Sequence, residues 1–199
     1  MPTLIYNTCA YVALEKTAIT RLISYFGTSY NLPNTDSEQI FYPAKEVFTS
    51  QTKISEVKRH YPKHFYFAFV RNPFDRSVSH YTSQRISSPD SEKYVDFETY
   101  MCSQNPLWNN LPPMSQHLNV AIDFIGKFET LKEDFTRLHN VLNIPVPDPH
   151  PLDIISNSSE FRRKKRPLSY YYTEKSIAYA VHKYQKDFEN FKYSPKFQF

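Results

Sequence analysis

Glycine is almost absent from this chain of 199 residues. Gly27 and Gly126 are its only two glycines, and loops that wrap a phosphate usually need glycine because it lets the backbone approach an anion closely. The Walker A pattern G-x-x-x-x-G-K-[ST] is therefore excluded. Any loop that binds a phosphate in this chain must be built from residues with side chains.

Cysteine and long apolar runs are also scarce. Cys9 and Cys102 can form at most one disulfide, and they show no metal-ligand spacing, so we expect no metal. No run of 18 apolar residues occurs, and the N-terminus lacks the charged region, apolar core and cleavage site of a signal peptide. These features predict a cytoplasmic protein without a membrane span.

Aromatic residues are abundant, with 16 Tyr and 16 Phe making up most of an aromatic content of 17%. The formal net charge is +4 and the pI is near 8.9, which favours anionic ligands. This excess falls short of the basic stripe of nucleic-acid-binding proteins, so we expect no nucleic-acid partner. The length predicts one domain that spans residues 1–199.

Expected strands alternate with expected helices along the chain. The strands are predicted at Tyr11–Leu14, Phe65–Val70 and Ile122–Glu129. The helices are predicted after Arg71 and at Thr17–Phe26, Ala44–Phe48, Ile54–Arg59, Leu131–Leu142 and Thr173–Phe188. The alternation predicts an α/β fold with a P-loop-like parallel sheet flanked by helices. The proline-bearing stretch Asn105–Gln116 is expected to be an irregular lid on the substrate side.

One segment joins a buried strand to a helix through an arginine. Phe65–Val70 is an unbroken apolar run, typical of a strand covered on both faces of a parallel sheet. Asn72 is a good helix cap, and Pro73 suits the first helical position. Arg71 therefore falls at the carboxyl end of a central strand, where open α/β sheets bind ligands, and it is predicted to anchor a phosphate.

A second candidate site lies between the first expected strand and its helix, at Leu14–Arg21. A lysine and hydroxyl groups at such a turn can hold an anion together with backbone N–H groups and the helix dipole. Taken alone, the same residues also fit a helix start with a solvated lysine.

With the Arg71 segment, the chain resembles the carbohydrate sulfotransferases, the family of heparan and chondroitin O-sulfotransferases and their bacterial relatives. Phe69–Tyr81 is similar to the family's 3′-phosphate motif F-V-R-N-P-F-D-R-x-x-S-x-Y. Ile122–Asp134 resembles its D-F-I-G-K-F-E-x-L-x-x-D block, and Ser169–Tyr193 its closing Y-Y-T…Y-x-x-D-x-x-x-F-x-Y signature. The three blocks occur in the family's order.

The resemblance implies that the chain moves a sulfuryl group from 3′-phosphoadenosine-5′-phosphosulfate (PAPS) to a hydroxyl or amine of a saccharide or other small acceptor. It assigns Arg71 and Ser79 to the 3′-phosphate of this donor. The residues matched to the loop around the 5′-phosphosulfate are Lys16, Thr17, Ala18, Ile19, Thr20 and Arg21. Lys16 is also the expected catalytic cation, because negative charge gathers on the oxygens of the transferring group.

The chain departs from the family in its first loop and at the position of a candidate base. In the loop, Glu15, Ile19 and Arg21 replace the proline, glycine and serine of the family pattern P-K-T-A-G-T-S. The β-branched Ile19 is expected to restrict the approach of the backbone to an anion. Phe41 occupies the position of a histidine that is a plausible base in bacterial members. Glu46 is therefore our first candidate for the general base, with His80 and His117 as alternatives. Each of the three also fits a purely structural or solvated role.

Two other functions stay open at this stage. The changes at Ile19 and Phe41 favour a catalytically degenerate member that binds the nucleotide or acts as an interaction module. The basic run Arg162–Arg166 fits a nucleic-acid-binding protein, although a solvated loop or a clamp on an anionic ligand explains it equally well.

Overall fold

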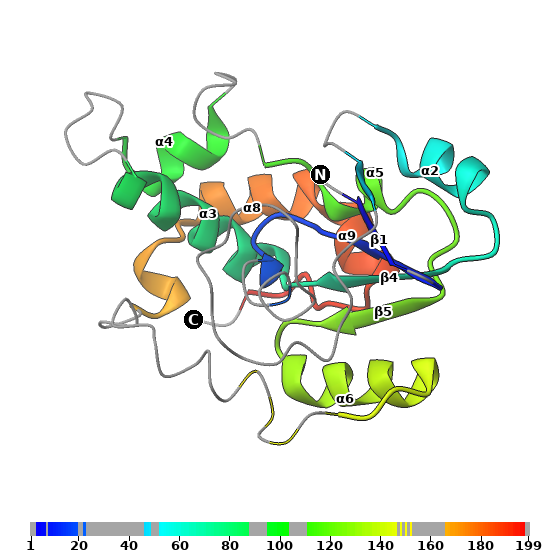
Figure 1. The fold of residues 1–199 in the computed structure, drawn as a ribbon. Coiled ribbons are helices and arrows are strands. Elements are labelled where there is room, and N and C mark those ends of the chain that lie inside the picture. The colour runs from blue at the N-terminus through cyan, green and yellow to red at the C-terminus, as the bar shows by residue number, and fades with distance from the viewer. Residues whose placement is uncertain are drawn as a thin grey trace. The chain divides into compact units, whose positions relative to one another are not determined.

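The computed structural model describes residues 3–6, 8–19, 22, 46–48, 52–87, 95–103, 111–146, 148, 150, 152 and 166–197 (Figure 1). The chain divides into two compact units, each made from two stretches of sequence. The sheet unit comprises Met1–Val70 and His117–Arg163, and the helical unit comprises Arg71–Gln116 and Lys164–Phe199. The expectation of a single domain stays a prediction.

The sheet unit is built on a mixed sheet. Its described strands are β1 Thr3–Ile5, β2 Cys9–Val12, β3 Glu46–Phe48, β4 Phe65–Val70 and β5 Phe124–Lys127. They lie in the order β3-β1-β2-β4-β5, with β2, β4 and β5 parallel and β1 antiparallel to both of its neighbours. The predicted α/β fold is thus confirmed, but the sheet is not parallel throughout. The reason is that β1 and β2 form a hairpin, and a short connection can only join antiparallel strands.

Two of the predicted elements differ from those in the structure. The helix expected at Ala44–Phe48 is wrong, because Glu46–Phe48 is strand β3 and pairs with β1 from Ile5 opposite Glu46. The strand expected at Tyr11–Leu14 begins two residues earlier, at Cys9. Strands of three or four residues are too short to show a period of two, so the pairing partner decides their conformation.

The centre of the sheet carries an aromatic core. Phe67 and Phe69 of β4 are fully buried, and the ring of Phe67 stacks on Tyr11 of β2 at 5.2 Å between centroids. Helix α6, Leu131–Leu142 as predicted, contributes Phe135 and Leu138 to the same core. Figure 1 shows α6 alongside β5. A second helix of this unit, α2, spans Ile54–His60.

The segment Ile122–Asp134, which resembles a block of the family, has a structural role. The Asp134 carboxylate accepts hydrogen bonds from the Lys127 N–H at 2.7 Å, the Thr130 hydroxyl at 2.9 Å and the Arg137 guanidinium at 2.6 Å. It therefore fixes the turn from β5 into α6. Asp123 accepts from the backbone N–H of Tyr66, which ties β5 to β4.

The helical unit packs around aromatic side chains. Its described helices are α3 Pro73–Ser87, α4 Phe97–Cys102, α5 Met114–His117, the 3-10 turn η2 Leu168–Tyr170, α8 Glu174–Lys183 and α9 Gln185–Asn190. The last residue of α5 belongs to the sheet unit. Phe74, Tyr81, Phe97 and Tyr172 meet in the core, mostly edge to face.

The helix expected at Thr173–Phe188 is divided into α8 and α9. Thr173 caps α8 through a capping box with Ser176. The backbone of Tyr184 leaves the helical region with φ −107° and ψ 21°, and α9 starts at the next residue. None of the described helices combines the length and the apolar character needed to cross a membrane.

Candidate active site

Arg71 lies where the sequence predicts it, between a strand and a helix. Strand β4 ends at Val70 and α3 begins at Pro73. The Asn72 side chain caps the helix by accepting the backbone N–H of Phe74 at 2.9 Å. Arg71 is 7% exposed, so its guanidinium is held largely out of water. A buried cation of this kind needs an anion, because an isolated buried charge is costly.

Asp75 supplies an anion to Arg71. Its Oδ2 accepts from Nε of Arg71 at 2.6 Å and lies 2.5 Å from Nη2. Ser79, the second predicted contact of the 3′-phosphate, is half-buried on α3. It lies one turn beyond Asp75 and on the same side of the helix, because residues four apart are neighbours. Our sequence analysis missed Asp75, although its spacing from Arg71 was a usable signal.

The loop after β2 adopts two left-handed backbone conformations. They fall at Lys16, with φ 64°, and at Ala18, with φ 71°. Alternation of left- and right-handed residues can turn successive N–H groups toward one point and form an anion-binding nest. Lys16, which carries the predicted charge, is half-buried in this loop.

Ile19 has an ordinary backbone conformation. It is not among the described residues with positive φ, so its own φ does not call for glycine, while its effect on the approach of an anion stays a prediction. Its side chain packs with Ala18 against the core of the sheet unit. The backbone N–H of Leu22 donates to Ala18 at 3.0 Å, which marks the start of a helical turn. Thr20 and Arg21 lie outside the described residues.

Thr17 is placed inside the loop. It is fully buried, and its hydroxyl donates to the carbonyl of Leu14 at 2.7 Å. Burial raises the pKa of the neighbouring Tyr11, and the nearby Thr17 side chain partly offsets that effect. The side chain of Thr17 thus closes a turn within the loop, while its contact with the donor stays a prediction.

The loop and Arg71 follow neighbouring strands of the sheet. Strands β2 and β4 are parallel, with Val12 opposite Ala68. Their carboxyl ends therefore share one edge of the sheet unit, where open α/β sheets bind ligands. The chain leaves this edge after Val12 into the loop and after Val70 into Arg71.

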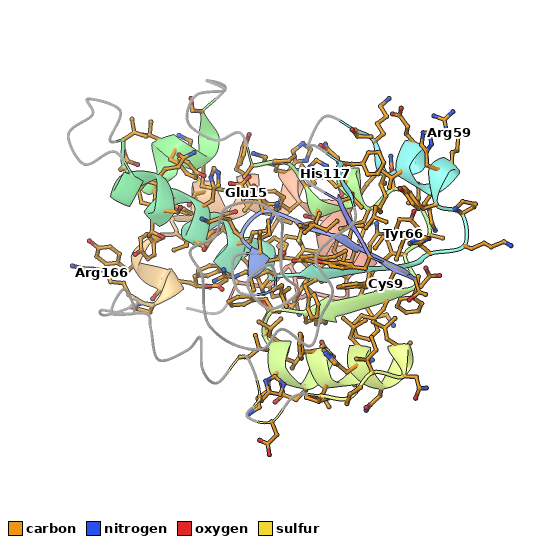
Figure 2. All side chains as sticks on the ribbon, in the orientation of Figure 1. Cys9, Glu15, Arg59, Tyr66, His117 and Arg166 are labelled. Carbon is orange, nitrogen blue, oxygen red and sulfur yellow. The ribbon has the colours of Figure 1, made fainter. Side chains whose placement is uncertain are left out.

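The three candidate bases lie on different elements of the fold. His80 is 3% exposed, and its ring nitrogen bonds to the Tyr100 hydroxyl within the helical unit. His117 is the half-buried last residue of α5 and is labelled in Figure 2. Glu46 belongs to β3, but its side chain lies outside the described part of the structure, as does Phe41.

The described end of the expected lid is held in place. Both oxygens of the Asp187 carboxylate accept backbone N–H groups, from Met114 and from Ser115, each at 2.8 Å. Asp187 is fully buried. Residues 104–110 of the expected lid lie outside the described part.

Two further buried side chains bind the same stretch. Arg76 is 1% exposed and donates to the carbonyl of Pro112 at 2.8 Å. The Tyr184 hydroxyl donates to the carbonyl of Leu111 at 3.2 Å. Burial, and then the positive charge of Arg76, lower the pKa of Lys183 to about 8. We call Arg76, Tyr184 and Asp187 the buried clamp.

Only the end of the basic run is described. Arg166 is exposed, and its guanidinium lies 4.0 Å from the ring centre of Tyr170 (Figure 2). Residues 162–165 lie outside the described part. Within the described residues, no group of three or more His, Cys, Asp or Glu side chains is arranged to hold a metal ion.

Comparison with known families defines the class of protein. The chain matches the Sulfotransferase family over residues 11–194, a span that includes the Lys16 loop, Arg71 and the buried clamp. The chain belongs to the sulfotransferase family, whose enzymes transfer sulfuryl groups. No curated protein and no solved structure matched it.

Proposed function

We propose that this chain transfers a sulfuryl group from PAPS to a hydroxyl or amine of a saccharide or other small acceptor. The observation that carries the proposal is Arg71, a nearly buried guanidinium placed directly after a central parallel strand and before a capped helix. It falls within the region matched to the family. Sulfotransferases generally use PAPS, and its 3′-phosphate is the group that suits such a cation.

The two ends of the donor are assigned to different residues. Arg71 and Ser79 take the 3′-phosphate, and the loop of Lys16, Thr17, Ala18, Ile19, Thr20 and Arg21 takes the 5′-phosphosulfate. Support for the second assignment comes from the left-handed conformations at Lys16 and Ala18. Backbone N–H groups turned toward one point by such conformations can bind an anion without glycine.

The reaction is an in-line displacement at sulfur. The bond from sulfur to the 5′-phosphate oxygen breaks, a bond from sulfur to the acceptor oxygen or nitrogen forms, and 3′-phosphoadenosine-5′-phosphate (PAP) leaves. Lys16 offsets the negative charge that develops on the sulfuryl and leaving oxygens. A general base takes the acceptor proton, and Glu46 is our first candidate for it, followed by His117.

Calorimetric titration with PAP and turnover of labelled PAPS test the proposal together. Wild type is expected to bind PAP, and Arg71→Ala to lose at least tenfold in affinity, since a hydrogen bond to a charged group contributes about 1.5–3 kcal/mol. Lys16→Ala is expected to lower turnover more than PAP binding. Absence of PAP binding by the wild type would contradict the proposal.

A catalytically degenerate member that only binds the nucleotide is the alternative from the sequence. It rests on the changes at Ile19 and Phe41; the backbone of Ile19 has no positive φ, so a β-branched residue fits there without strain. Transfer of label from PAPS to any saccharide or small hydroxyl acceptor decides between the two. Binding of PAP without transfer to a broad acceptor panel would favour the alternative.

A further inference from the structure

The ion pair between Arg71 and Asp75 is built from one carboxylate oxygen and two guanidinium nitrogens. Oδ2 lies 2.6 Å from Nε and 2.5 Å from Nη2. The two side chains are 8% and 15% exposed. Two contacts on one edge define the plane of a guanidinium, whereas a single contact would leave it free to turn. The pair therefore sets the orientation of Arg71 as well as neutralising its charge.

The pair joins the end of a strand to the start of a capped helix. Arg71 precedes the cap residue Asn72, and Pro73 occupies the first position of α3, so the start of the helix presents Asp75 within reach of Arg71. Asp75 is in the first turn of α3, where a carboxylate is also favoured by the helix dipole. Ser79 follows one turn later. Asp75 is thus positioned between the two residues assigned to the 3′-phosphate.

The position of Asp75 beside a proposed phosphate site needs an explanation, because a carboxylate repels a phosphate. If charge alone attracted the ligand, Asp75 would only weaken the site, and a lysine would serve as well as an arginine. A guanidinium has five N–H donors in a fixed fork. When a carboxylate binds one edge of the guanidinium, the remaining N–H donors are held in a fixed direction. The ordered orientation favours binding, although the carboxylate lowers the net positive charge of the site.

We propose that Asp75 is a positioning residue for Arg71, which it orders for recognition of the 3′-phosphate of the nucleotide donor. The inference rests on the proposed function, because the phosphate monoester is the group that Arg71 is assigned to bind. It adds a residue that touches no ligand itself and acts through the guanidinium. It also predicts that affinity depends on the geometry of the ion pair rather than on the net charge near Arg71.

The test compares PAP with adenosine 5′-monophosphate (AMP), which lacks the 3′-phosphate. The ratio of their dissociation constants isolates the contribution of the 3′-phosphate from any general loss of folding. Asp75→Ala is expected to lower this selectivity for PAP by about tenfold or more, while affinity for AMP stays within about twofold. Asp75→Asn keeps an oxygen that accepts from Nε, so it should retain an intermediate selectivity and serves if the alanine variant does not fold.

Glu98→Gln is the matched control. Glu98 of α4 also pairs with a cation in the helical unit, the exposed Lys175 at 3.1 Å, but away from Arg71 and Ser79 in the sequence. Its replacement is expected to leave the ratio of PAP to AMP affinity unchanged.

Three outcomes separate this inference from the function on which it rests. Reduced selectivity in Asp75→Ala with partial retention in Asp75→Asn supports the positioning role. Equal or tighter PAP binding by both variants overturns it, and Asp75 is then only a competing anion, while the effect of Arg71→Ala keeps the proposed function. Equal affinity of the wild type for PAP and AMP overturns the 3′-phosphate assignment and this inference with it.

Discussion

The neighbours of Gly126 leave little room for a side chain. A Cβ atom there would lie 2.4 Å from Cε1 of Phe69, 2.7 Å from its Cδ1, and 3.2 Å from Cβ of Asp134. We expect Gly126→Ala to destabilise the fold by about 1–3 kcal/mol through overpacking. Urea denaturation measures the change in the free energy of unfolding.

A double-mutant cycle identifies the cause of the Gly126 effect. With Phe69→Leu as the second change, the alanine at position 126 should cost less, because the ring that it meets is gone. Additive effects of the two substitutions would contradict a direct clash between them.

The left-handed conformation at Ala18 makes a second residue-scale prediction. With φ at 71°, the backbone of an alanine is strained by about 1–2 kcal/mol, whereas that of a glycine is not. Ala18→Gly is therefore expected to change stability by less than about 1 kcal/mol, because relief of strain offsets the greater entropy of glycine in the unfolded chain. Ala180→Gly, in the buried interior of α8, is the control and should cost about 1 kcal/mol or more. Equal losses at the two sites would contradict strain at Ala18.

Buried His139 makes stability depend on pH. The ring is 1% exposed and bonds to the Phe135 carbonyl at 2.9 Å, and burial lowers its pKa below the ordinary value of 6.5. The unfolded chain therefore binds a proton before the folded chain does, so stability falls as the pH drops below about 6.5.

Chemical denaturation at pH 8 and at pH 5.5 checks the role of His139. The difference in stability between the two pH values should shrink in His139→Gln. The exposed His182 of α8 gives the control, since His182→Gln should leave the difference unchanged. An unaltered difference in His139→Gln would show that other groups govern the acid response.

At the scale of elements, the buried clamp explains the closing signature of the chain. Tyr184 and Asp187 lie in or beside α9 and bind backbone groups more than 70 residues earlier in the sequence. The signature was visible in the sequence. The segment that it contacts, Leu111 to Ser115, was not predictable, because it lies far from α9 along the chain. We infer that this part of the expected lid is a fixed support.

Removal of the Asp187 charge should loosen that support. Asp187→Asn replaces one accepting oxygen by an amide group facing a backbone N–H, and the buried donor left unpaired costs about 1–3 kcal/mol. Hydrogen exchange at the amides of Met114 and Ser115 is expected to accelerate together with the fall in stability. Glu189→Gln, an exposed residue of α9, should change neither. Unaltered exchange in Asp187→Asn would contradict the clamp.

Elements with strong local signals were predicted well. β4 and α6 have the predicted bounds because one is an uninterrupted apolar run and the other has a sustained helical period. β1 and β3 were missed or assigned wrongly because their pairing with each other decides them. In the candidate site, Arg71 and its helix cap were predicted, whereas the pairing with Asp75 and the inward position of Thr17 required coordinates.

At the scale of the whole molecule, nucleotide binding should stabilise the chain. A ligand that binds only the folded state at 100 times its dissociation constant adds about 2.7 kcal/mol, which for a protein of this size raises the Tm by roughly 5–10 °C. We expect this shift with PAP in a thermal unfolding scan of the full chain. Arg71→Ala should show little shift at the same concentration, and an equal shift in that variant would exclude Arg71 as an anchor.

The sequence by itself determined the strand, cap and helix around Arg71, the α/β class and the kinship to sulfotransferases. These depend on residues near one another along the chain, or on motifs whose spacing is local. Only the tertiary structure decided that the sheet is mixed, that Lys16 and Ala18 rather than Ile19 take the left-handed positions, and that Asp187 holds a distant loop. Those features depend on contacts between groups that are far apart in the sequence. Burial of these contacts then determines how much each contributes to the free energy of folding.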